Sequence, residues 1–219
     1  MNITPRIIGV IQVKGGAGRS TVSTNIAGEL SKLGKTVLID CDMPQGTSAS
    51  WFSVREQAGK AGHLIADTAT NHRELVAKVE QYQDADFIVL DGPPRIAELT
   101  RAILVLADLC LIPVGASAAE IWATSDLLVL VEEANKVRSV NARMVWTRYR
   151  SHTRLAQELS ELATKELGLD ALATTLGMRV AYPEALGDGL TVAELPEPSA
   201  KAEVKSLIDE IQKLLRKKL

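Results

Sequence analysis

The sequence predicts an α/β fold, a doubly wound and mostly parallel sheet with helices on both faces. Short runs rich in Val, Ile and Leu alternate with segments of helical periodicity along the whole chain. The runs show little alternation of apolar and polar residues, which is typical of parallel strands that are buried on both faces. A glycine-rich segment lies between the first run and the first helical segment, an order that belongs to doubly wound domains.

The predicted elements follow one another without a linker or an internal repeat. Strands are expected at Arg6–Val13, Lys35–Cys41, Phe87–Leu90, Leu109–Val114 and Ala142–Trp146. Helices are expected at about Ser20–Leu33, 72–82, 97–107, 119–137, 152–167 and Ala200–Lys217. A length of 219 residues suits one domain with a large core better than two. We therefore expect residues 1–219 to form a single domain.

Composition excludes a strong general attraction to nucleic acid or membranes. The net charge is −2, with 46% hydrophobic and 24% charged residues, as in ordinary soluble proteins. The first residues carry no basic segment or cleavage site, and no apolar run approaches the roughly 18 residues of a membrane span. Cys41 and Cys110 lie in strand-like runs, which favours reduced core cysteines. These features predict a cytoplasmic protein.

The segment Val13–Thr21, VKGGAGRST, nearly matches the phosphate-binding pattern G-x-x-x-x-G-K-[ST]. It has Val13 in place of the first glycine and Arg19 in place of the lysine, and it adds a lysine, Lys14. The glycines would let backbone N–H groups point at an anion, and the following helix would add its positive end. The Ser20 hydroxyl is a candidate ligand for Mg²⁺. The alternative is a plain glycine-rich turn between a strand and a helix.

Two further segments place carboxylates at the ends of predicted strands. Asp40 and Asp42 follow the second strand, in IDCDMPQG, and Asp91 follows a hydrophobic strand, in VLDGPP. Ligands of α/β sheets bind at this edge, and an aspartate after a hydrophobic strand is typical of a magnesium-binding Walker B segment. Alone, each could be a turn residue; in this order they predict an NTPase.

Together, KGGAGRST, IDCDMPQG and VLDGPP resemble the ParA/MinD group of deviant Walker A ATPases, a P-loop NTPase fold, over essentially the whole chain. The patterns of this group are K-G-G-x-G-K-[ST]-T, D-x-D-x-Q-G and hydrophobic-D-x-P-P. The resemblance implies ATP, ADP and Mg²⁺ as cofactors. It also implies that Lys14 reaches the ATP of the partner subunit in an ATP-bound homodimer, whereas the alternative is a solvated surface lysine. Residues expected to bind the phosphates are Gly15, Gly16, Ala17, Gly18, Arg19, Ser20 and Thr21.

The same resemblance assigns the catalytic and metal-binding roles. Asp42 would position the attacking water, and Lys14 and Arg19 would act on the phosphates as the other catalytic residues. Ser20, Asp40 and Asp91 would hold or support Mg²⁺. Arg19 departs from the pattern, because arginine keeps the charge of lysine but is longer and planar. We expect it to allow nucleotide binding but slow hydrolysis.

A segment near the C-terminus is the candidate for base contact. In the resembled group the loop after the last core strand packs on the adenine, which points here to Met178, Arg179, Tyr182 and Pro183. Simple loop packing is the alternative.

Basic residues concentrate in one part of the chain. Residues 136–157 contain six Lys or Arg and no acid. The candidates for sequence-independent contact with DNA are Arg148, Arg150, Arg154, Arg216 and Lys217. Solvated helix ends are the alternative.

The leading hypothesis is a short ParA-like ATPase that positions a cargo. It would dimerise with ATP, bind the nucleoid, and be released when a ParB-like or cargo adaptor stimulates hydrolysis. The alternative is a MinD-like, membrane-cycling ATPase, for which Leu214, Leu215 and Leu219 could form an anchor. Because these leucines continue an apolar stripe that begins at Val204, we expect no stable membrane association. The helix that begins near Ala118 could serve an interface, although Trp122 is equally compatible with the core.

Overall fold

A seven-stranded parallel sheet confirms the predicted fold class. The computed structural model describes residues 4–94, 97–150, 158, 163 and 165–216, and within them the strand order is β3-β2-β4-β1-β5-β6-β7. Every neighbouring pair is parallel. The strands are β1 (Arg6–Val10), β2 (Thr36–Asp40), β3 (Leu64–Thr68), β4 (Phe87–Asp91), β5 (Leu109–Gly115), β6 (Ala142–Tyr149) and β7 (Ala171–Gly177).

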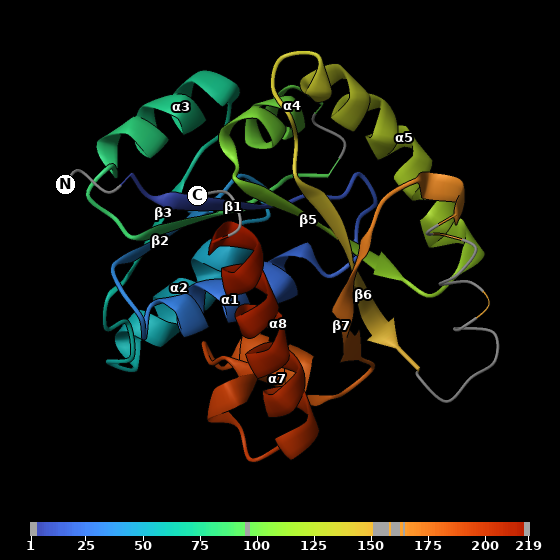
Figure 1. Cartoon of the computed structure of the whole chain (residues 1–219). Helices are drawn as coiled ribbons and strands as arrows, with labels where there is room; N and C mark the ends of the chain where they lie inside the picture. Colours follow the sequence, from blue (N-terminus) through green and yellow to red (C-terminus); the bar gives the residue numbers. More distant parts are fainter. Residues whose placement is uncertain (1–3, 95–96, 151–157, 159–162, 164, 217–219) are drawn as a thin grey trace.

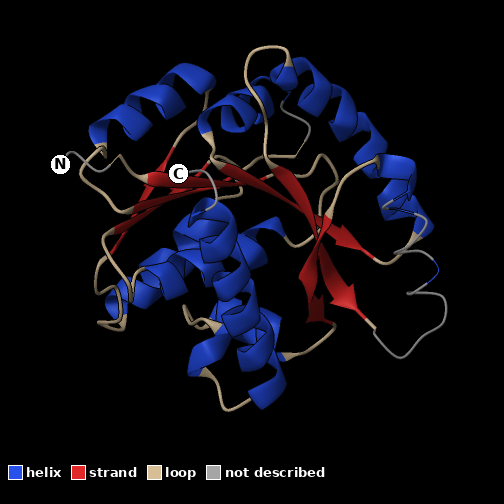
Figure 2. Ribbon diagram, viewed as in Figure 1, coloured by secondary structure: helices blue, strands red, loops and turns tan. Residues whose placement is uncertain are grey.

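Helices cover both faces of the sheet (Figure 1). One face carries α3 (His72–Gln81), α4 (Ala97–Leu106) and α5 (Ala118–Asn135). The other carries α1 (Arg19–Leu30), α2 (Thr47–Gln57), α7 (Ala181–Gly187), the 3₁₀ turn η1 (Val192–Glu194) and α8 (Pro198–Arg216). Figure 2 shows the strands enclosed between these two helical layers. The core therefore consists of two apolar clusters, one on each face.

The central strands are buried at nearly every position, because both of their faces are covered. This is why β1, β2, β4 and β5 were visible in the sequence as continuous apolar runs. Several boundaries differ from the prediction: β1 ends at Val10, and β2 ends at Asp40, so Cys41 is buried just beyond the strand. The final helix runs from Pro198 to Arg216.

Four elements were missing from the sequence prediction. The two edge strands, β3 (LIADT) and β7 (ALATTLG), carry polar and small residues because one edge of each has no partner strand in the described sheet. Helix α2 (TSASWFSVREQ) has no clear apolar stripe, since its buried positions are Ser48, Trp51 and Arg55. Helix α7 occupies what the sequence predicted to be a loop. The helix predicted at 152–167 lies largely outside the described residues.

None of the helices that the structure describes combines the length and the apolar character that crossing a bilayer requires.

Candidate nucleotide site

The glycine-rich loop joins β1 to α1 at the edge where the parallel strands end. Gly16 and Gly18 have φ values of 74° and 95°, a left-handed conformation that favours glycine, and Gly18 is the N-cap of α1. A Cβ atom at Gly15 or Gly16 would meet nothing within 4 Å, so the loop is open on that side. Thr147, on β6, donates a hydrogen bond of 3.0 Å to the Ala17 carbonyl and ties the loop to the sheet. The loop is thus shaped to present backbone N–H groups and a helix N-terminus to an anion.

The side chain of Arg19 folds back under this loop. Its Nη1 donates hydrogen bonds of 2.6 Å to the Gln12 carbonyl and 2.8 Å to the Lys14 carbonyl. Its Nη2 lies 3.4 Å from Oδ2 of Asp42, and the residue is only 7% exposed. Two of the predicted catalytic residues, Arg19 and Asp42, are therefore in direct contact.

Lys14 lies at the mouth of the loop beside Glu120, on the first turn of α5. Its Nζ is 3.9 Å from Oε1 of Glu120, and its side chain is 37% exposed. The same Glu120 oxygen accepts a hydrogen bond of 2.5 Å from Arg148, and Oε2 accepts one of 2.6 Å from the backbone N–H of Gly115. A long and partly exposed ion pair is weak, so Lys14 can leave Glu120 at little cost.

Arg148 also adopts a left-handed backbone conformation, with a φ of 50°, which is uncommon for a residue other than glycine. The sequence suggested this residue for DNA contact. The structure places it beside the glycine-rich loop, paired with Glu120.

Asp91 is completely buried at the end of β4. Ser23 and Ser48 donate hydrogen bonds of 3.0 and 2.6 Å to its two carboxylate oxygens. Burial and the nearby charge of Asp40 raise the pKa of Asp91 to about 6, although hydroxyl groups, including that of Ser20, act in the opposite direction. The carboxylate is thus held where a compensating positive charge would stabilise it.

Asp40 organises the segment that follows β2. Its Oδ1 accepts a hydrogen bond of 2.9 Å from the N–H of Asp42, and its Oδ2 accepts one of 3.0 Å from the N–H of Ala49 in α2. Both carboxylate oxygens of Asp40 therefore accept hydrogen bonds from backbone N–H groups, which suits a supporting role better than direct coordination of a metal.

The donor set fits Mg²⁺ that is bound together with a phosphate. The Ser20 hydroxyl interacts with the Asp91 carboxylate, and both offer the hard oxygen ligands that Mg²⁺ prefers. Among the described residues no group of three His, Cys, Asp or Glu side chains could hold a metal ion alone. Mg²⁺ commonly binds to one or two protein oxygens and completes its shell with phosphates and water, so these residues suffice.

A cavity of about 310 Å³ adjoins the loop. Gly16, Gly18 and Thr21 line one side of it. The four residues proposed from the sequence for base contact line the other side: Met178, Arg179, Tyr182 and Pro183. The sequence predicted a loop for Tyr182 and Pro183, whereas in the structure both residues belong to helix α7. Sequence reasoning missed Thr147, Leu176 and Leu186, which also line the cavity and carry no motif.

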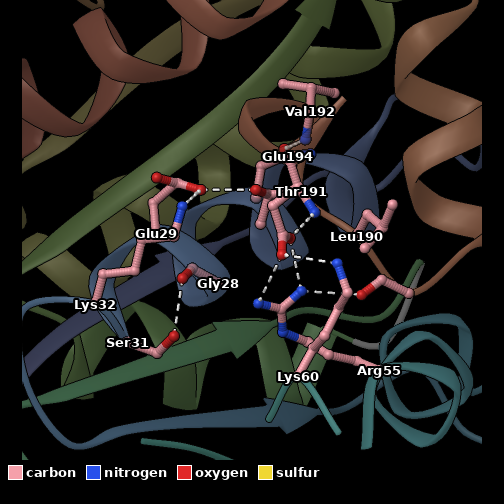
Figure 3. A network of polar contacts seen from close by, with 12 residues as sticks. Gly28, Glu29, Ser31, Lys32, Arg55, Lys60, Leu190, Thr191, Val192 and Glu194 are labelled. Carbon is pink, nitrogen blue, oxygen red and sulfur yellow. Dashed lines mark hydrogen bonds and ion pairs between the residues drawn. The ribbon is translucent and has the colours of Figure 1, made fainter. Parts of the chain in front are cut away.

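A polar network joins α2 to the segment between α7 and η1 (Figure 3). Arg55 donates hydrogen bonds of 3.0 Å to the Gly189 carbonyl and 2.7 Å to Oε2 of Glu194. Thr191 donates one of 2.6 Å to Glu29 of α1. Trp51 adds a hydrogen bond of 2.9 Å to the Leu190 carbonyl, and its ring lies under the Arg55 guanidinium. These contacts fix α2, the helix that follows the Asp40–Asp42 segment, to the residues after α7, and α7 itself lines the cavity.

The basic candidates for DNA contact that the structure describes lie in two separate places. Arg148 and Arg150 are at the end of β6, near the cavity, where Arg150 Nη2 is 3.1 Å from Sδ of Met178. Arg216 is the last residue of α8 and lies beside Arg6 and Phe87, the first residues of β1 and β4. It is therefore near the N-terminal ends of the strands, whereas the cavity is near their C-terminal ends. Arg154 and Lys217 lie outside the described residues.

Trp122 settles one alternative that the sequence left open. It is 68% exposed on α5 and is therefore no core residue, and Val129 is exposed two turns further along the helix.

Comparison with known proteins agrees with this geometry. A family model described as ATPase MipZ matches residues 6–148. The chain is 29% identical to maintenance of carboxysome distribution protein A from Halothiobacillus neapolitanus, over 95% of this chain and 94% of that protein. It is 28% identical to the chromosome-partitioning ATPase Soj from Thermus thermophilus, over 86% of this chain and 88% of that protein.

The structure of a Cyanothece McdA variant in complex with ATP superposes with a TM-score of 0.78 at 15% identity, over 95% of this chain and 97% of that chain, which supports the fold. The glycine-rich loop, the carboxylates at the ends of β2 and β4 and the match across residues 6–148 lead to one conclusion: this chain belongs to the ATPase MipZ family, within the ParA/MinD group of ATPases.

Proposed function

We propose that the protein is a ParA-like positioning ATPase, which binds ATP and Mg²⁺, pairs as a dimer on ATP, and moves or segregates a cargo. The observation that carries the proposal is the convergence of Lys14, Arg19, Asp42 and Asp91 around one glycine-rich loop beside a largely apolar cavity of about 310 Å³. The names of the relatives, which refer to carboxysome distribution and chromosome partitioning, support a role in positioning.

Each part of the site has a role in this proposal. Residues Gly15 to Thr21 hold the phosphates, the cavity takes the base, and Ser20 and Asp91 hold Mg²⁺, with Asp40 supporting the adjacent segment. Bound Mg²⁺ supplies positive charge to the phosphates. Asp42 positions the attacking water once it is released from Arg19, because its carboxylate faces the loop.

Lys14 would complete the site of a second subunit. Its weak ion pair with Glu120 and its partial exposure leave it able to extend across an interface. A cation placed on the transferring phosphoryl group from the partner stabilises developing charge and makes pairing depend on the nucleotide.

Binding to the nucleoid would use the basic end of β6. Arg148 and Arg150 lie there, close to the nucleotide site, and the expected contacts are with phosphates and not with bases. An adaptor of the ParB type, or a cargo adaptor, would then stimulate hydrolysis and release the protein.

A MinD-like membrane cycle is the second candidate. The apolar stripe of α8 argues against it, since Leu207, Ile211 and Leu215 pack into the core beneath the sheet rather than facing outward. Pelleting with liposomes in the presence of ATP tests it directly, and retention on the liposomes would favour this candidate.

The decisive experiment combines light scattering with a DNA gel shift in ATP, in ADP and without nucleotide. We expect a dimer and a shifted DNA band with ATP alone. Lys14→Ala should remain a monomer with ATP, whereas the matched change Lys201→Ala, at an exposed lysine of α8, should behave as the wild type. A wild-type protein that stays monomeric with ATP would refute the proposal.

A further inference from the structure

Glu203, on α8, binds three of the residues that line the cavity, although it lies far from every motif in the sequence. Its Oε1 accepts hydrogen bonds of 2.9 and 2.7 Å from Nε and Nη2 of Arg179. Its Oε2 accepts one of 2.7 Å from the Tyr182 hydroxyl and one of 3.0 Å from the N–H of Gly177. One carboxylate thus joins β7, the turn after it and α7.

The surroundings are built for this carboxylate. The Glu203 side chain is only 17% exposed, and a Cβ atom at Gly177 would come within 2.9 Å of its Oε1. A larger residue at position 177 would therefore displace the carboxylate. The ion pair with Glu203 raises the pKa of Arg179, and burial together with the hydrogen bond to Glu203 raises the pKa of Tyr182 well above its usual range.

The contacts of Glu203 determine which atoms the cavity presents. Because Arg179 and Tyr182 direct their polar groups to Glu203, their apolar parts remain for the cavity wall. The rest of that wall is largely apolar, with Val22, Leu176, Met178, Pro183 and Leu186. Such a wall suits the face of a flat ring. Without the carboxylate, the Tyr182 hydroxyl would lose its partner, and the Arg179 guanidinium would keep only the longer ion pair of 3.7 Å with Glu197 among the ion pairs described.

We propose that Glu203 is a positioning residue for the base of the nucleotide: it holds Arg179 and Tyr182 in the arrangement that the base contacts. The inference rests on the proposed function, since it requires that the cavity take the base of ATP. It assigns a role in nucleotide affinity to the C-terminal helix, which carries none of the nucleotide-binding motifs.

Glu210 offers a matched control on the same helix. Two turns after Glu203, it accepts hydrogen bonds of 2.9 and 3.0 Å from the N–H groups of Ala173 and Thr174, and so also fixes α8 to β7. Neither of these two hydrogen-bond partners lines the cavity. If Glu203 served only to dock α8 on β7, replacing Glu203 and replacing Glu210 should have the same effect.

The experiment measures the affinity of the full chain for ATP and for inorganic tripolyphosphate, which has no base, both with Mg²⁺. We expect Glu203→Ala to weaken ATP binding about tenfold, as for the loss of a charge-assisted contact, and to leave tripolyphosphate binding unchanged. KM for ATP should rise while kcat stays the same. Glu203→Gln, which keeps the shape but loses the charge that faces Arg179, should fall between the two. Glu210→Ala should change neither affinity.

Three results would overturn the inference: unchanged ATP affinity in Glu203→Ala, an equal loss for tripolyphosphate, or the same selective loss in Glu210→Ala. Thermal unfolding of each variant tests whether the fold is retained, and Glu203→Gln supplies the comparison if the alanine variant unfolds. If the wild type binds ATP no better than tripolyphosphate, the assignment of the cavity to the base fails as well. If ATP does bind and Glu203→Ala is unaffected, the inference alone fails.

Discussion

The Arg19 guanidinium lies 3.4 Å from the carboxylate of Asp42 and is held there by the carbonyls of Gln12 and Lys14. The loop therefore uses its own backbone to retain the cation that replaces the usual lysine. In this arrangement the guanidinium of Arg19 is engaged by groups of the protein itself, two backbone carbonyls and the Asp42 carboxylate.

Arg19→Lys should raise ATP turnover, by about tenfold if one well-placed contact to the transition state is regained. A lysine ammonium cannot bind two carbonyls and a carboxylate with the planar geometry of arginine, so it is free to follow the phosphates. Steady-state release of phosphate measures the effect. Arg19→Met, which removes the charge, is the control and should lose activity. Equal or lower turnover in Arg19→Lys would contradict the view that Arg19 is a compromise.

Arg55→Met should lower the free energy of unfolding by about 2 kcal/mol, less than for a fully buried ion pair, because Glu194 is partly exposed and keeps Lys60 at 3.7 Å. Arg55 is buried, and its loss leaves the Gly189 carbonyl and Glu194 without their main donor. Urea denaturation followed by circular dichroism measures the change. Arg73→Met, at an exposed position of α3, is the control. A loss below about 0.5 kcal/mol, the range of ordinary surface changes, would show that the network of Figure 3 adds little stability.

The loss of stability at acid pH should also depend on the ion pair between Arg55 and Glu194. Burial raises the pKa of Glu194, but hydrogen bonds from Arg55 and Thr191 outweigh it, so the net pKa is lowered. A carboxylate of this kind stabilises the fold fully above its ordinary pKa of about 4.3, and the contribution is lost as the pH falls through the lowered value. Arg55→Met should therefore lose less stability than the wild type as the pH falls from about 5 to about 3. Urea midpoints across this range provide the test, and parallel curves would argue against it.

Gly28→Ala should destabilise the protein, although alanine favours helices by about 1 kcal/mol relative to glycine. A Cβ atom at position 28 would lie 2.3 Å from Cγ2 of Thr191, so α1 and η1 would have to separate. We expect a net loss of about 1 to 3 kcal/mol, as for overpacking of a core. Thermal unfolding measures it. Gly28→Ala combined with Thr191→Ser, which removes the opposing methyl group, should recover part of the loss.

Replacing Arg150 and Arg154 with alanine should weaken DNA binding to the same degree for all sequences. Each phosphate contact that is lost should reduce the slope of log affinity against log salt by about 0.9. Fluorescence anisotropy with two unrelated duplexes, at several salt concentrations and with ATP, measures both quantities. Arg216→Ala provides the comparison, because Arg216 lies near the N-terminal ends of β1 and β4, away from Arg150. A loss confined to one duplex would indicate base recognition instead.

Local patterns in the sequence were sufficient for the centre of the fold and for the glycine-rich turn between β1 and α1. The strands β1, β2, β4 and β5 are buried on both faces, so their apolar runs are unmistakable, and the positive φ values at Gly16 and Gly18 favour glycine. The edge strands β3 and β7 gave no such signal, because each has a partner strand on one side alone in the described sheet and several of its residues are only partly buried.

The sequence by itself determined the features that depend on residues close together along the chain. These are the strand, the glycine turn, the helix N-terminus and the aspartates at the strand ends. Only the tertiary structure decided which distant groups satisfy one another. Arg19 turning to Asp42, Glu120 pairing with Lys14 and Arg148, Arg55 reaching Glu194 and Glu203 holding Arg179 and Tyr182 all join separate elements. The physical reason is that a buried charge must find its partner in space, and the packing of the helices on the sheet fixes which partner is within reach.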